Sequence, residues 1–567
     1  MKPKHASLFS CSALALACAG SAAFADITSQ EVWDKMRAYY EVQGISMSAT
    51  ETVTDTGVTL TDMVFTSPEG MEGEPDVTMS MSGWTLTDQA DGTVSLSWVE
   101  PMVLTFDIVE PGIASDMDDD TDATDDMEAQ SMDQGAMKDD DKKGDDDSAV
   151  GDDMATDTGD AMSDTMSGEG EHIRFVLSLT HDSPSVVISG SADDMTTTYG
   201  AVLASMNLDS VEVDGEAIGN AQFNLKIANP GTVTRMVTTD TTYQFDTTYD
   251  MGATSYDLSV IIPEEEGNIQ MNGEWANLTA GFDGTFPLDW DPIDMAANMA
   301  AGFDMKGSAQ IGASNSSFNF QVDGELVSGT SGSSGGEFAL AMGPAGLHID
   351  GASRDVDYAV QGSEIPFPIS LKATEFGMGF TMPIMQSDMP QDFGLKLSLR
   401  DLAVDDLLWM LIDPTGAVPH DPATLVVDLA GKANWLVNIM DPAVQAELDD
   451  SDEVPAELHA LTLNDLQLKL AGAELTGTGD FTFNNDDLET FDGLPAPDGS
   501  VALKLTGGNT LLTTLIDMGL IPEDEALGIR MMLGIFTSPV EGEDDTLTST
   551  LEVKSDGSIS ANGQRLQ

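Results

Sequence analysis

Apolar residues recur at every second position through most of this 567-residue chain, and this alternation limits the folds that the chain can adopt. Successive side chains of a strand point to opposite sides, so such a run predicts a strand with one apolar face. The clearest run is formed by Ile173, Phe175, Leu177 and Leu179. We therefore predict a mainly β fold (α+β), with long, curved antiparallel sheet(s), a few short packing helices and a disordered acidic insert.

The alternating runs predict strands in three parts of the chain. Before the middle of the chain they are 53–65, 77–86, 94–98, 103–109, 173–180, 185–189, 232–249, 255–262 and 269–275. Next comes a hairpin of 317–327 and 337–342, with the Gly/Ser run 328–336 predicted as its flexible loop. The last strands are 461–483, 501–505, 547–553 and 559–561, with hairpin turns predicted at Asp498-Gly499 and Asp556-Gly557.

Helix signals occur at only a few places. Thr28 and Glu31 have the spacing of a capping box, in which each side chain bonds to the backbone of the other, and Gly44 is a plausible end. We predict a helix between them and four more, at 293–303, 405–412, 510–518 and 522–536.

Residues 115–171 interrupt the alternation. They contain 22 acidic residues and three lysines, and they lack the apolar residues that could offset the entropy of ordering. Because the alternation resumes directly afterwards, we predict a long disordered loop between two strands. The predicted regions are therefore 1–25, 26–114 with the first helix and strands, 115–171, a β-rich 172–390, and a C-terminal β region with helices, 391–567.

The charge balance excludes some partners. The chain has 99 Asp and Glu against 21 Lys and Arg, a formal net charge of −78. Nucleic-acid binding needs Lys and Arg to neutralise phosphates, so no nucleic acid is expected as a partner. The same balance disfavours anionic lipid headgroups.

The first 25 residues have the pattern of a secretory signal peptide. Lys2 and Lys4 precede an apolar stretch over 8–19, and cleavage is expected after Ala25. A lipoprotein anchored through Cys18 is an alternative. However, the large apolar residue before it, Leu16, stands one place away from the position that the lipoprotein signal requires. No other stretch approaches the roughly 18 apolar residues of a transmembrane helix. We expect a periplasmic protein without a transmembrane segment and, after cleavage, without cysteine.

No catalytic, cofactor-binding or metal-binding residues can be named from the sequence. The segment 332–336 matches the hydrolase motif G-x-S-x-G, but a predicted strand follows it where the motif needs a helix. The few histidines lack zinc-binding spacing. No window of the acidic insert combines the alternate ligands, the central glycine and the final Glu of a calcium-binding EF-hand loop. We therefore expect a protein that is not an enzyme and has no cofactor.

The C-terminal third carries several short motifs. They are Asp413-Pro414, Pro419-His420-Asp421-Pro422-Ala423-Thr424-Leu425, Leu475-Thr476-Gly477-Thr478-Gly479-Asp480, Leu520-Ile521-Pro522-Glu523-Asp524, Arg530-Met531-Met532-Leu533-Gly534 and Ala561-Asn562-Gly563-Gln564-Arg565-Leu566. They resemble the uncharacterised Gram-negative envelope family called domain of unknown function 2125. That resemblance implies no catalytic residues. More remotely, the alternation is similar to AsmA-like envelope proteins, which implies a long sheet whose apolar trough holds lipid.

Two functional hypotheses follow. The first is a non-enzymatic envelope protein that binds a lipid, another apolar ligand or another envelope protein along an apolar concave sheet face. The alternative is an acidic ion-binding (calcium or copper) or stress protein that acts through the insert 115–171, whose carboxylates and methionines could bind calcium or copper.

Overall fold

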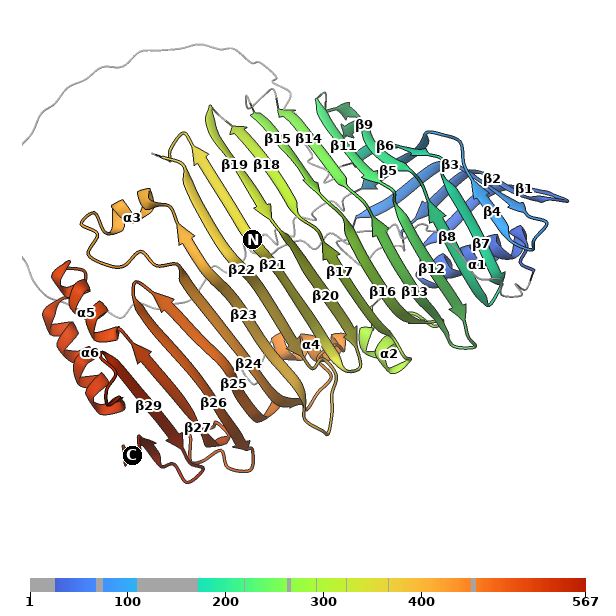
Figure 1. The fold of residues 1–567 in the computed structure, drawn as a ribbon. Helices are drawn as coiled ribbons and strands as arrows, with labels where there is room; N and C mark the ends of the chain where they lie inside the picture. The colour runs from blue at the N-terminus through green and yellow to red at the C-terminus, as the bar shows by residue number, and fades with distance from the viewer. Residues whose placement is uncertain are drawn as a thin grey trace, which may run out of the picture.

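The computed structural model describes residues 26–67, 75–109, 172–218, 220–262, 267–291, 293–322, 324–365, 367–449 and 455–566. All named strands within these ranges belong to one sheet, and every pairing between them is antiparallel (Figure 1). The predicted mainly β fold with a few short helices is confirmed. The predicted signal peptide and the whole of the predicted insert lie outside the described residues.

The sheet is an up-and-down meander in which each long strand pairs with the next one along the chain. It opens with β1 (Ser46–Thr54), β2 (Gly57–Thr66) and β3 (Asp76–Asp88). Strands broken into two segments follow: β4 (Val94–Ser97) with β5 (Met102–Val109), β6 (His172–Asp182) with β7 (Ser185–Ser191), β8 (Asp194–Gly200) with β9 (Leu203–Val213), β11 (Ala221–Ala228) with β12 (Gly231–Thr238), β13 (Thr242–Met251) with β14 (Thr254–Ile262), β15 (Gly267–Trp275) with β16 (Leu278–Pro287), β17 (Asp304–Ile311) with β18 (Ser314–Val322), and β19 (Glu325–Ser333) with β20 (Gly335–Gly343). The short β10 (Glu216–Ala217) extends the edge of β9.

The second part of the meander is built from unbroken strands. They are β21 (Gly346–Gly362), β22 (Ile369–Met382), β23 (Gln391–Val404), β24 (Ala423–Trp435), β25 (Ala456–Leu470), β26 (Ala473–Asn484), β27 (Ala496–Thr506) and β29 (Thr546–Val553). The small strands β28 (Ser538–Pro539) and β30 (Ile559–Ala561) pair with the outer side of β29, and β31 (Gln564–Arg565) pairs with β30. The C-terminal edge of the sheet is therefore partly covered by its own chain.

The breaks in the strands line up across the sheet, and we call this line the crease. It runs through 98–101, 183–184, 201–202, 229–230, 252–253, 276–277, 312–313, 334, 355 and 401. Crease residues bond to one another: the Asn229 amide donates to the Val202 carbonyl (2.9 Å), and the Gly312 amide donates to the Asn277 carbonyl (2.8 Å). Positive φ angles occur along it at Ser183, Asn229, Asp355 and Asp401. Such residues are typical of β-bulges.

The crease explains a change in the alternation of the apolar residues. In β13 they stand at odd numbers, as in Tyr243 and Phe245, and in β14 at even numbers, as in Tyr256 and Leu258. An uninterrupted strand would put these two sets on opposite faces. One extra residue at the crease returns both sets to the same face. Across the crease, the ring of His181 in β6 indeed contacts the ring of Tyr199 in β8, with centroids 6.0 Å apart.

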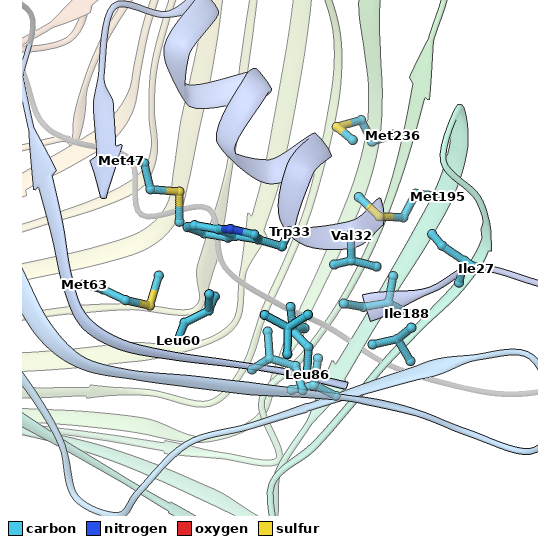
Figure 2. Close-up of a cluster of buried hydrophobic side chains, with 14 of the residues drawn as sticks. Ile27, Val32, Trp33, Met47, Leu60, Met63, Leu86, Ile188, Met195 and Met236 are labelled. Atoms are coloured by element: carbon cyan, nitrogen blue, oxygen red, sulfur yellow. The ribbon is translucent and has the colours of Figure 1, made fainter. Parts of the chain in front are cut away.

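Helix α1 (Ser29–Val42) covers the N-terminal part of the apolar face. Its predicted capping box is present: the Glu31 amide donates to the Thr28 hydroxyl (3.3 Å), and the Thr28 amide donates to the Glu31 carboxylate (2.9 Å). Figure 2 shows Trp33 lying beside Met47. The buried cluster beneath α1 comprises Ile27, Val32, Trp33, Met47, Val58, Leu60, Met63, Phe65, Met81, Leu86, Val94, Leu96, Val186, Ile188, Met195, Tyr199, Met236 and Tyr243.

The remaining helices are short. Helix α2 (Met295–Ala300) forms a second, smaller buried cluster with Phe303 and Ile384, and it is shorter than the predicted 293–303. The predicted helices 405–412, 510–518 and 522–536 are found as α3 (Asp406–Ile412), α5 (Gly508–Asp517) and α6 (Glu523–Phe536). Helix α4 (Pro442–Asp449) was not predicted.

Two turn predictions are wrong. The Gly/Ser run 328–336 is not a loop, because it forms the adjoining ends of β19 and β20, and Val322 pairs with Glu325 across the true turn. Asp498-Gly499 lies within β27. Glycine is accommodated in these strands because large neighbours cover it: the Phe318 ring lies over Gly329, and the Phe481 ring lies over Gly499.

Candidate functional site: the open apolar face

Three rows of residues, apolar except for Ser353, cross the sheet from β20 to β27, and we call them the open apolar face. The rows follow the strand register, so neighbouring members are directly opposite one another. They are Gly336, Ser353, Phe376, Leu399, Leu425, Leu468, Leu475 and Leu505; Phe338, Gly351, Met378, Leu397, Val427, Leu466, Gly477 and Leu503; and Leu340, Ile349, Phe380, Leu395, Leu429, Leu463, Gly479 and Val501.

Large side chains of this face are exposed to solvent. Phe376 is 53% exposed, Met378 54% and Phe338 47%, whereas Trp33 beneath α1 is 1% exposed. In the described part of the chain, the two buried clusters form beneath α1 and around α2. The cluster around α2 includes Met342 and Met382, so it borders the open apolar face without covering it. Contiguous exposed apolar surface of this kind marks an interaction site.

Glycines widen the contact surface between the large side chains. A Cβ atom at Gly431 would lie 2.3 Å from the ring of Phe393, and one at Gly477 would lie 2.6 Å from the side chain of Leu503. Real Cβ atoms do not approach other atoms so closely. Glycine at these positions therefore leaves room for the neighbouring side chain to lie flat against the backbone of the sheet. The large side chains therefore spread over the backbone rather than standing upright.

The opposite face of the sheet is polar. Its side chains line most of the hollows in the sheet. Two open hollows, of about 610 and 490 Å³, share Asn272, Ser317 and Thr330. A third, of about 910 Å³, is lined by residues such as Thr248 and Gln310. Among the described residues, these hollows are thus lined mainly by polar side chains. The apolar side chains form an open surface rather than a hollow.

A polar cluster at the crease brings together residues that the sequence keeps far apart. His181 Nδ1 lies 3.0 Å from Glu100 Oε1, and Trp98 Nε1 donates to the same carboxylate (2.8 Å). Tyr199 contacts the His181 ring, and its burial, with the nearby Glu100 charge, raises its pKa to about 12. The His181 side chain is 8% exposed. The cluster joins the two halves of the sheet beside the α1 core.

The motif residues Asp413 and His420 have a structural role. The buried Asp413 carboxylate accepts bonds from the Val418 amide (2.8 Å) and the Thr415 hydroxyl (3.0 Å). Bonds from the Ala417 and Val418 amides to the charged form hold the pKa of Asp413 well below its usual range. The His420 ring stacks on Trp409, with centroids 4.4 Å apart. These contacts fix the connection between α3 and β24.

The described residues contain no group of three or more His, Asp or Glu side chains that could hold a metal ion. None of their helices is long and apolar enough to cross a bilayer. Comparison with known proteins found no match to a family model, a curated protein or a solved structure. The resemblance to domain of unknown function 2125 and to AsmA-like proteins therefore stays a prediction.

Proposed function

We propose that this chain is an exported, non-enzymatic envelope protein whose open apolar face binds lipid. The observation that supports this proposal is the solvent exposure of Phe338 on β20 and of Phe376 and Met378 on β22, which flank Gly351 of β21 on one apolar face. Burial of apolar surface stabilises by about 25 cal/mol per Å². A hydrocarbon chain lying across these strands would remove that surface from water on both partners.

The charge of the chain favours a lipid without net negative charge. The formal net charge of −78 repels anionic headgroups at low ionic strength. An acyl chain on a neutral headgroup meets the apolar face without this repulsion. The pattern of the first 25 residues, described above, supports export to the periplasm.

Titration with a pyrene-labelled monoacylglycerol tests the proposal. Replacing both Phe376→Ser and Met378→Ser should weaken binding by about tenfold or more, because two large apolar contacts are lost. The matched control is Lys396→Ser, on the opposite face of β23, which should leave the affinity unchanged. Absence of binding to the unmodified protein, or equal weakening by the control, would contradict the proposal.

Deleting residues 115–171 separates this proposal from the alternative of an ion-binding insert. These residues fall within the connection between β5 and β6, which are paired neighbours, so their removal leaves the pairing of the two strands possible. We expect unchanged affinity for the monoacylglycerol. Loss of the protein's effect in cells on deletion, with lipid binding intact, would favour the insert as the active part.

A further inference from the structure

The apolar face carries one group of hydroxyls at the crease, which we call the hydroxyl cluster. It consists of Ser314 and Ser333, whose Oγ atoms are 2.8 Å apart, and Ser316 and Ser331, whose Oγ atoms are 2.7 Å apart. Trp275 of β15 is paired directly with Ser314. The cluster therefore spans the neighbouring strands β15, β18 and β19 where they reach the crease.

The register places this cluster on the apolar face. Gly273, opposite Ser316, is covered by the ring of Tyr256, so this ring marks the face to which Gly273 belongs. Trp275 lies two positions further along β15 and shares that face. In the same way Ser316 shares its face with Phe318, two positions along β18. The cluster thus adjoins apolar side chains.

Some hydrogen-bond donors of Trp275 and the hydroxyl cluster are not used within the described part of the protein. The indole N–H of Trp275 is buried and has no partner among the described residues. In each serine pair one hydroxyl donates to the other, which leaves the second hydroxyl free to donate outward. A buried donor without a partner is unfavourable, and an acceptor from a ligand would relieve it.

Two charged residues beside the cluster belong to the other face. Glu274 alternates with Trp275 along β15, and Asp357 of β21 is paired with Gly332, which alternates with Ser331 and Ser333, so both belong to the opposite, polar face. An anionic headgroup would be repelled by the overall negative charge of the chain. The donors instead suit an uncharged oxygen acceptor.

We infer that the hydroxyl cluster and Trp275 bind the ester or amide carbonyl of a neutral lipid. This inference rests on the proposed function, because it assigns the polar end of the ligand whose hydrocarbon chain lies on the apolar face. The neighbouring β20 carries the exposed Phe338 across the crease from Ser333, so a single lipid can reach both places.

Two pyrene-labelled probes of equal length test the inference: a monoacylglycerol, which has an ester carbonyl, and an alkane, which has no acceptor. The unmodified protein should bind the ester at least about tenfold more tightly, because two or three hydrogen bonds are added. Combining Trp275→Phe, Ser316→Ala and Ser331→Ala should strongly reduce this preference and leave the affinity for the alkane unchanged. Trp275→Phe alone, which removes one N–H and keeps an aromatic ring, should reduce the preference in the same direction.

The matched control combines Ser317→Ala and Ser328→Ala, on the polar face of the same strands, and should keep the full preference. Equal binding of the two probes to the unmodified protein, or a preference that survives both the triple and the single substitution, would overturn the inference alone. Failure of both probes to bind would overturn the proposed function as well, so the two failures are distinguishable.

Discussion

The stretch of the sheet beneath α1 and the open apolar face differ in how their apolar side chains are covered: α1 packs on the first, whereas large side chains of the second are exposed to solvent. Both have alternating apolar residues and the same antiparallel pairing. Beneath α1, Leu60 and Leu86 are fully buried, whereas Phe376 and Met378 on the open face are more than half exposed. The same sequence pattern thus produces a closed core at one end and an accessible surface at the other.

Because of this difference, we expect side chains at the closed end to stabilise the fold and side chains on the open face to contribute to binding. The closed end excludes water from a cluster that contains Trp33 and Val32, so substitutions there remove well-packed contacts. On the open face, a side chain loses few contacts when it is shortened. We therefore expect the same kind of substitution to lower the free energy of unfolding much more at the closed end than on the open face.

The largest expected effect is a contrast between Trp33→Ala and Phe376→Ala. Trp33→Ala should lower the free energy of unfolding by about 3–5 kcal/mol, because it empties a buried site. Phe376→Ala should lower it by less than about 1 kcal/mol, because the ring is exposed. Urea unfolding followed by circular dichroism measures both changes. A similar loss of unfolding free energy in the two variants would contradict the proposed difference between the two regions.

A smaller effect is expected where α1 begins. Thr28→Ala removes a side-chain cap and should lower the free energy of unfolding by about 1 kcal/mol. Thr28→Ser keeps the hydroxyl and serves as the control, with little change expected. An equal loss in both variants, measured by the same urea titration, would show that the capping bond does not stabilise the closed end.

Acid should act on the C-terminal half through Asp413. Its pKa is lower when folded than when unfolded, so its stabilising effect is present above about pH 4 and is lost as the pH falls below that value. Asp413→Asn should therefore destabilise the protein at pH 7 and reduce the dependence of stability on pH below about 4. Unfolding midpoints measured between pH 7 and pH 2 check this, and an unchanged acid dependence would contradict it.

Alkali should act on the closed end through Tyr199. Its pKa is raised to about 12 by burial, so its effect on stability is full below the unfolded value of about 10 and is lost as the pH rises towards 12. Tyr199→Phe should leave stability at pH 7 nearly unchanged and reduce its loss above pH 10. Thermal unfolding at pH 7 and at pH 11 measures this smallest effect, and identical alkaline losses in both proteins would contradict it.

The alternation and the helix signals were sufficient to predict much of the fold. Thr28 with Glu31 located α1, and the run from Ile173 to Leu179 located β6. The crease escaped prediction because the shift from odd to even positions looks like the end of one strand and the start of another. The serine- and glycine-rich run 328–336 looked like a loop because its covering side chains come from other strands.

The candidate site could be predicted only in part. An apolar sheet face followed from the pattern, but whether a helix covers it depends on tertiary packing that period-two patterning does not encode. The cluster of Glu100 and His181 joins residues 81 positions apart, and Trp275 meets Ser314 and Ser333 only through strand register. A search for polar residues near the breaks of several alternating runs could have suggested both groups.

Lipid analysis of the purified protein is the most direct test of the claim that the open apolar face is a binding surface. The unmodified chain and the variant with both Phe376→Ser and Met378→Ser would be purified in parallel without detergent, extracted and examined by mass spectrometry. We predict a neutral lipid in near-stoichiometric amount with the unmodified chain and a large reduction in the variant. Equal amounts of lipid in both proteins, or none in either, would contradict the claim.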